Sequence, residues 1–229
     1  MIHSLQHITD LAEILYLHGV RDVVISPGSR NAPLIQTFYK RFGESCTSIV
    51  DERSAAYFAL GQSLFTKKPT VLISTSGTAA LNYAPAVAEA FFQGVPLIMI
   101  TADRPPEWIG QQNNQAIWQN NIFGNNVKAE YTLPVESSNI DNLWYAHRII
   151  NEAFCKTLAD KPGPIHINVP LREPLYKKLP DANPGINIIR NEKTEITLNE
   201  NGLLASKWKA AKSILIVAGQ HSPLSLIHI

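Results

Sequence analysis

Four short polar stretches follow four short apolar runs in the first half of the chain. They contain Ser29 and Arg30, then Glu52, then Ser76 and Thr78, and finally Asp103 and Arg104. Each stretch stands where a strand would give way to a helix, and the carboxyl ends of parallel strands meet at one edge of a sheet. A carboxylate, hydroxyl groups and two guanidinium groups gathered there would suit proton transfer and the binding of an anionic ligand. The repetition predicts one ligand crevice.

Apolar runs alternate with helix-like segments along the first 170 residues, and this alternation indicates the elements that would position the polar turns. Strands are expected at 23–25, 48–50, 70–74, 96–100, 128–133 and 164–169, and helices at 5–18, 31–42, 52–64, 77–92 and 141–159. The polar segment 113–123 is expected to be irregular. The pattern predicts an α/β fold, a mostly parallel sheet flanked by helices on both faces.

A change of composition after residue 176 predicts the domain organisation. Residues 1–176 would form the first domain, and 177–201, rich in Pro, Asn and charge, would be a linker. A helix near 203–211 and a strand at 213–217 would then begin a second α/β domain within 202–229. One helix and one strand cannot bury a core, so we expect the chain to be incomplete.

Composition argues for a cytoplasmic protein. Lys and Arg total 20 against 19 Asp and Glu, which gives no reason to expect nucleic acid or an anionic membrane as a partner. No apolar stretch approaches the ~20 residues of a membrane helix, and the amino terminus lacks the layout of a signal peptide. Cys46 and Cys155 have no metal-ligand spacing and are expected to be reduced thiols. We therefore expect no metal ligands in this chain.

Common nucleotide and nucleophile motifs are absent from the sequence. It contains no Gly-x-Gly pair, no Gly-Lys-Ser/Thr and no Gly-x-Ser-x-Gly elbow. The seven histidines are scattered, so surface or core roles outweigh catalysis for each.

A specific series of motifs is present instead. It consists of Ser26-Pro27-Gly28-Ser29-Arg30, Asp51-Glu52-Arg53, Thr75-Ser76-Gly77-Thr78, Thr101-Ala102-Asp103-Arg104-Pro105-Pro106 and Asn114-Gln115-Ala116-Ile117. In order and spacing, over residues 5–175, this series resembles the thiamine-diphosphate-dependent 2-succinyl-5-enolpyruvyl-6-hydroxy-3-cyclohexene-1-carboxylate synthases of menaquinone biosynthesis. The resemblance implies a pyrimidine-binding amino-terminal domain in an enzyme, a transferase that decarboxylates 2-oxoglutarate and adds the four-carbon unit to isochorismate.

The resemblance also implies roles for individual residues at the cofactor. Glu52 matches the family glutamate that shares a proton with ring nitrogen N1′ of thiamine diphosphate, which a carboxylic acid at that place can do. The alternative is a glutamate at a helix start paired with Arg53. Ser76, Gly77 and Thr78 would let the cofactor ring approach closely, and a plain helix cap is the alternative.

Five residues match the acceptor site of the family, where isochorismate binds: Ser29, Arg30, Arg104, Asn114 and Gln115. Two arginines suit a ligand with two carboxylates because a guanidinium group pairs bidentately with a carboxylate. For Arg30 and Arg104 the alternative is a surface salt bridge. Trp118 is assigned no role.

The family resemblance implies partners that this chain does not supply. Family members hold the diphosphate through Mg²⁺ or Mn²⁺ with a Gly-Asp…Asn motif in a later domain, and no Gly-Asp dipeptide occurs here. The family assembles as a homodimer or a dimer of dimers with the active site shared between subunits, so the chain alone is expected to be inactive. The alternatives are another thiamine-diphosphate-dependent decarboxylase or carboligase, and a non-catalytic dimerisation module of the same fold.

Overall fold

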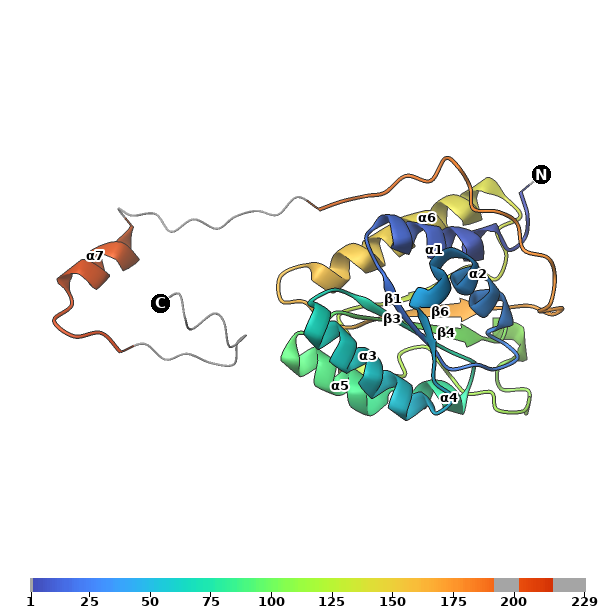
Figure 1. Cartoon of the computed structure of the whole chain (residues 1–229), viewed down its shortest axis with the longest axis horizontal. Coiled ribbons are helices and arrows are strands. Elements are labelled where there is room, and N and C mark those ends of the chain that lie inside the picture. The colour runs from blue at the N-terminus through green and yellow to red at the C-terminus, as the bar shows by residue number, and fades with distance from the viewer. Residues whose placement is uncertain (1, 192–201, 216–229) are drawn as a thin grey trace. The chain divides into compact units, whose positions relative to one another are not determined.

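A computed structural model of the chain describes residues 2–191 and 202–215. The chain divides into two compact units, Met1–Arg190 and Asn191–Ile229. Figure 1 shows that the sheet and most helices belong to the first unit. No helix in the described ranges is both long enough and apolar enough to cross a membrane.

The first unit is built on six parallel strands. They are β1 Asp22–Ile25, β2 Cys46–Ser48, β3 Thr70–Ser74, β4 Leu97–Asp103, β5 Glu130–Thr132 and β6 Ile165–Pro170. Their order across the sheet is β2-β1-β3-β4-β6-β5, and every neighbouring pair is parallel. The predicted α/β fold is confirmed.

Helices cover both faces of the sheet (Figure 1). On one face lie α1 Gln6–Leu17, α2 Ala32–Phe42 and α6 Ile140–Leu158, and on the other lie α3 Glu52–Thr66, α4 Thr78–Leu81 and α5 Ala84–Gln93. Short 3₁₀ turns, η1 Gly43–Ser45, η2 Pro106–Trp108 and η3 Gly124–Asn126, join some of these elements. Two helical layers around one sheet explain why its central strands are buried on both sides.

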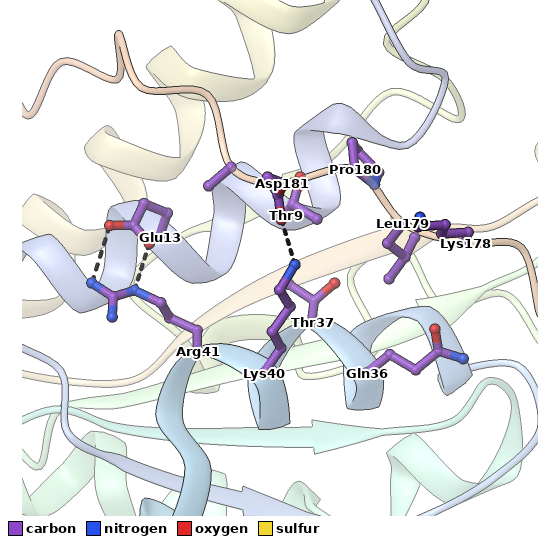
Figure 2. Close-up of a pocket in the computed structure, with 11 residues that line it drawn as sticks. Thr9, Glu13, Gln36, Thr37, Lys40, Arg41, Lys178, Leu179, Pro180 and Asp181 are labelled. Carbon is purple, nitrogen blue, oxygen red and sulfur yellow. Dashed lines mark hydrogen bonds and ion pairs between the residues drawn. The ribbon is translucent and has the colours of Figure 1, made fainter.

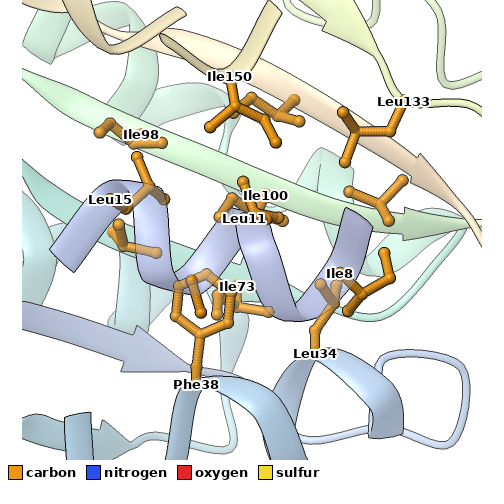
Figure 3. Close-up of a cluster of buried hydrophobic side chains, with 14 of the residues drawn as sticks. Ile8, Leu11, Leu15, Leu34, Phe38, Ile73, Ile98, Ile100, Leu133 and Ile150 are labelled. Atoms are coloured by element: carbon orange, nitrogen blue, oxygen red, sulfur yellow. The ribbon is translucent and has the colours of Figure 1, made fainter. Parts of the chain in front are cut away.

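Alternate side chains of each central strand enter different cores. Val23 and Ile73 join the core beneath α1, α2 and α6, which Figure 3 shows with Leu11 and Phe38. Leu72 belongs to the second core, under α3 and α5. Fully buried strands of this kind explain the continuous apolar runs in the sequence.

Three predicted boundaries were wrong. The helix expected at 77–92 is two helices, α4 and α5, because Pro85 has no N–H for a continuous helix and restricts the residue before it. The strand expected at 48–50 lies instead at Cys46–Ser48, the three residues that pair with Val23–Ile25 of β1. β4 runs to Asp103 rather than ending at residue 100, because β6 continues to pair with it.

Residues after 176 remain on the first unit as far as Arg190. Asp181 pairs with Lys40 at 2.5 Å, and the N–H of Asn183 donates to Asp10 at 2.8 Å. This segment closes a cavity of about 380 Å³ against α1 and α2 (Figure 2), where Arg41 also pairs with Glu13 at 2.5 Å. The first part of the expected linker is thus held by polar contacts.

The second unit contains α7 Leu203–Ala210, close to the helix expected there. Of the strand expected at 213–217, residues 213–215 have no regular structure and the rest lies outside the described residues. The division into a domain at 1–176, a linker and a second domain stays a prediction.

Candidate active site

The strand order of the sheet changes direction at β1, because β2 lies on one side of β1 and β3 lies on the other. In open parallel sheets the ligand crevice lies beyond the carboxyl ends of the strands at such a point. The turn after β1 and the turn after β3 touch there, because a Cβ on Gly28 would lie 2.5 Å from the Cβ of Thr75. The Ser26–Arg30 and Thr75–Thr78 motifs are therefore adjacent in space.

Glu52 is the first residue of α3 and lies at this same edge, after β2. Asp51 caps the helix by accepting the N–H of Ser54 at 2.7 Å, which leaves Glu52 free of a capping role. The Glu52 side chain is half-buried, and within the described residues it has neither a hydrogen bond nor an ion pair with Arg53. A half-buried carboxylate without a protein partner is available to a ligand.

The turn after β3 has an unusual backbone at Gly77, where φ is +83°. A Cβ at Gly77 would come within 1.7 Å of the Gln115 carbonyl oxygen, and the Gln115 side chain donates to the Ser76 carbonyl at 3.1 Å. Gly77 is thus required by its own backbone and by the 113–119 segment. The sequence predicts that small residues here admit a ring, and the structure adds this separate reason for the glycine.

Gln119 holds this turn against the ends of two strands. Its side-chain oxygen accepts the Gly77 N–H at 2.5 Å, and its amide nitrogen donates to Thr101 Oγ1 at 3.2 Å, the Ala102 carbonyl at 3.0 Å and Asn168 Oδ1 at 2.9 Å. Gln119 is 1% exposed. Sequence reasoning assigned Gln119 no role, since these partners come from distant elements.

Arg104 follows β4 and is 8% exposed. Its guanidinium group donates to Asn113 Oδ1 at 3.1 Å, to Ser76 Oγ at 2.9 Å and to the carbonyl of Asn114. All three acceptors are neutral, and within the described part of the chain no ion pair involves Arg104. Burial lowers the pKa of Arg104, and the nearby Arg30 charge adds to this. The salt-bridge alternative does not describe this arginine.

The carboxylate of Asp103 is engaged away from the Arg104 guanidinium. It accepts the main-chain N–H of Arg104 at 2.7 Å and the Asn168 amide at 2.8 Å. Burial raises the pKa of Asp103. Asp103 therefore helps to hold the Arg104 main chain and the Asn168 side chain in place at the carboxyl edge of the sheet.

Arg30 and Arg104 line one cavity of about 270 Å³, together with Pro105, Trp108, Asn113, Arg172 and Glu173. Arg30 forms an ion pair with Glu173 at 2.9 Å, so here the salt-bridge alternative is realised. Trp108, Asn113, Arg172 and Glu173 were missed from sequence, and the motif series offered no signal for the last two.

The remaining predicted acceptor residues lie outside the lining of this cavity. Ser29 is exposed in the turn after β1, Asn114 contributes its carbonyl to Arg104, and Gln115 lies against the Gly77 turn. Trp118 is exposed as well. In the described ranges, no group of three His, Cys, Asp or Glu side chains could hold a metal ion. The larger cavity of Figure 2 contains none of the predicted site residues.

Comparisons with known proteins show what the chain is similar to. The chain is 47% identical over 222 residues to a 2-succinyl-5-enolpyruvyl-6-hydroxy-3-cyclohexene-1-carboxylate synthase of Cytophaga hutchinsonii, with 95% of this chain and 39% of that protein covered. Enzymes of the same name match from Desulfotalea psychrophila (46% identity; 94% and 41% covered) and Bacteroides thetaiotaomicron (38% identity; 96% and 40% covered).

The chain spans about two fifths of the length of these curated relatives. Residues 8–123, just over half of the chain, match the family model described as "Thiamine pyrophosphate enzyme, N-terminal TPP binding domain". On this match the chain belongs to the thiamine pyrophosphate enzymes, of which it carries the N-terminal cofactor-binding domain.

Proposed function

We propose that this chain forms the pyrimidine-binding part of a synthase that decarboxylates 2-oxoglutarate and adds the four-carbon unit to isochorismate in menaquinone biosynthesis. The observation that carries the proposal is the cavity on which Arg30 and Arg104 both lie, at the sheet edge that also holds Glu52. The product named for the relatives has a ring carboxylate and an enolpyruvyl group. Two guanidinium groups would match an acceptor with two carboxylates.

The residues at the crevice fit thiamine diphosphate. Glu52 presents a half-buried carboxyl group that no described residue engages, and it would hold and exchange a proton at N1′ of the aminopyrimidine ring. The Ser76–Thr78 turn, fixed by Gln119, would line the ring. Bound thiamine diphosphate supplies the nucleophilic carbon that attacks a 2-oxo acid.

The two arginines would orient the acceptor by different contacts. Arg104 is held by three neutral oxygens and keeps its positive charge, since guanidinium does not deprotonate in proteins. It is therefore ready for a carboxylate without losing an ion pair. Ser29, Asn114 and Gln115 would complete the site from the surrounding turns.

Assembly and metal binding are part of the same proposal. Tyr57, Phe58 and Phe65 of α3 and Phe92 of α5 are exposed, and Figure 1 shows these two helices on the same side of the sheet. Such a face supports a homodimer or a dimer of dimers with a shared active site. Mg²⁺ or Mn²⁺ would be held by another domain of a cytoplasmic enzyme, and we propose that the 229-residue chain alone is inactive.

Glu52→Gln tests the proposal in a synthase of full family length. Glutamine keeps the shape of the side chain but cannot exchange a proton, so kcat should fall by about 100-fold or more, the scale of general acid–base catalysis. The measurement is the steady-state consumption of isochorismate and 2-oxoglutarate. Near-normal turnover would refute the role of Glu52.

Calorimetry separates the alternatives. A different carboligase of this architecture would not need both arginines for its acceptor, and a dimerisation module would show no heat with isochorismate. Under our proposal isochorismate binds, and Arg104→Ala weakens its binding by about 2–5 kcal/mol, or about 30-fold or more, as expected for loss of one buried charged partner.

A further inference from the structure

The cavity at the sheet edge combines three arginines with one carboxylate. Arg172 is paired outward, with Glu107 at 2.6 Å and with Glu136 at 3.4 Å. Arg30 is paired with Glu173, which itself lines the cavity. Arg30 and Arg172 thus each have an ion-pair partner, whereas no ion pair to Arg104 occurs among the described residues.

Arg30 has two anchors of different kinds. One terminal nitrogen donates to the Leu171 carbonyl at 2.8 Å, and the other donates to Glu173 at 2.9 Å. The Arg30 side chain is 13% exposed, whereas that of Glu173 is 71% exposed. The main-chain anchor does not involve the Glu173 side chain, so the guanidinium group would keep this hydrogen bond if the carboxylate left.

We propose that Glu173 is an internal stand-in for a substrate carboxylate. In the free protein it occupies the edge of Arg30 that faces the cavity. When a ligand with two carboxylates binds, one pairs with Arg104 and the other displaces Glu173 from Arg30. This inference rests on the proposed function, because it requires an acceptor with two carboxylates.

The stand-in has a measurable consequence for affinity. A second ligand carboxylate must compete with an ion pair and approach a residual negative charge. Glu173→Gln removes the charge and leaves the Leu171 anchor in place. We expect isochorismate to bind about fivefold more tightly to this variant, the scale of one largely exposed ion pair.

A double-mutant cycle tests whether the effect passes through Arg30. Isochorismate affinity is measured by calorimetry, without 2-oxoglutarate, on the synthase of full family length and on Glu173→Gln, Arg30→Ala and the double variant. In the Arg30→Ala background, neutralising Glu173 should change the affinity by less than about twofold. Glu173→Ala provides a second neutral variant and should also tighten binding.

Glu152→Gln is the matched control. Glu152 pairs with Arg148 at 3.0 Å on α6, is exposed, and does not line the cavity, so isochorismate affinity should not change. Unchanged or weaker binding to both neutral Glu173 variants would overturn the stand-in. Equal tightening without Arg30, or in Glu152→Gln, would do the same because it would indicate a general charge effect.

Arg104→Ala separates this inference from the proposed function. If Arg104→Ala weakens isochorismate while the Glu173 variants change nothing, the acceptor site stands and only the stand-in fails. If the wild-type enzyme does not bind isochorismate, or Arg104→Ala has no effect, the proposed acceptor site itself fails.

Discussion

Gln119→Leu tests whether one buried amide fixes the turn that we assign to the cofactor. The side chain is 1% exposed and makes four hydrogen bonds, one accepted from Gly77 and three donated to Thr101, Ala102 and Asn168. Leucine is similar in size but can neither accept nor donate. The substitution therefore removes the contacts while leaving the apolar volume nearly the same.

The magnitude follows from the groups that lose their partner. Asn168 Oδ1 keeps a second donor, Thr101 Oγ1 at 3.2 Å, so its loss is small. The N–H of Gly77 has no other acceptor among the residues that the structure describes, and a buried donor without a partner costs about 1–3 kcal/mol. With about 1 kcal/mol for the donated bonds, the free energy of unfolding should fall by about 2–4 kcal/mol.

The assay is urea-induced unfolding of the chain at pH 7, followed by circular dichroism. Gln93→Leu is the control, because Gln93 is exposed at the end of α5 and, among the described residues, its amide hydrogen-bonds only to Glu89, so the substitution should change the free energy of unfolding by less than about 0.5 kcal/mol. Gln119→Glu keeps the acceptor for Gly77 but turns an oxygen toward Ala102 and Asn168. Gln119→Glu should lower the free energy of unfolding at least as much as Gln119→Leu. A Gln119→Leu protein as stable as the Gln93→Leu control would refute the reasoning.

Two further predictions concern stability. Gly77→Ala should destabilise the fold by more than the ~1–3 kcal/mol of its strained backbone alone, because the new Cβ would meet the Gln115 carbonyl. The control is Gly61→Ala, in the exposed middle of α3 with open space around it, which should instead stabilise the fold by about 0.5–1 kcal/mol. Equal effects of the two substitutions in urea unfolding would contradict this reasoning. Burial beside Ser137 lowers the pKa of His7 to about 4, so between pH 6.5 and 4 the unfolded chain binds a proton that the folded chain does not. As the pH falls across this window, the free energy of unfolding should fall by about 3 kcal/mol. If the wild-type protein loses no more stability over this window than the His7→Gln variant, His7 is not the cause.

The order of elements could be predicted because buried parallel strands leave a clear mark in sequence. The β-branched run at Thr70–Ser74 was placed without error. Errors arose where a neighbour decides the outcome. Val50 continues an apolar run yet is exposed, because the pairing of β2 with β1 ends at Ile25 and Ser48.

The candidate site was predicted only as far as local motifs extend. Arg30 and Arg104 were paired through the family resemblance, and the structure places both on one cavity. The roles of Gln119 and Glu173 depend on contacts across 42 and 143 positions of the chain, to Gly77 and to Arg30. No local sequence pattern predicts such pairs, because each residue taken alone is typical of a polar side chain in a loop.

The difference between the two arginines is an argument for function in its own right. Burying a charge is costly unless a counter-charge or several hydrogen bonds compensate it. The Arg104 guanidinium group donates only to neutral oxygens, because the adjacent Asp103 carboxylate accepts the Arg104 main-chain N–H and the Asn168 amide instead. The half-exposed Arg172, by contrast, pairs with Glu107. A buried guanidinium group with no ion pair among the described residues, on the same cavity as a paired arginine, is what a site for an external carboxylate requires.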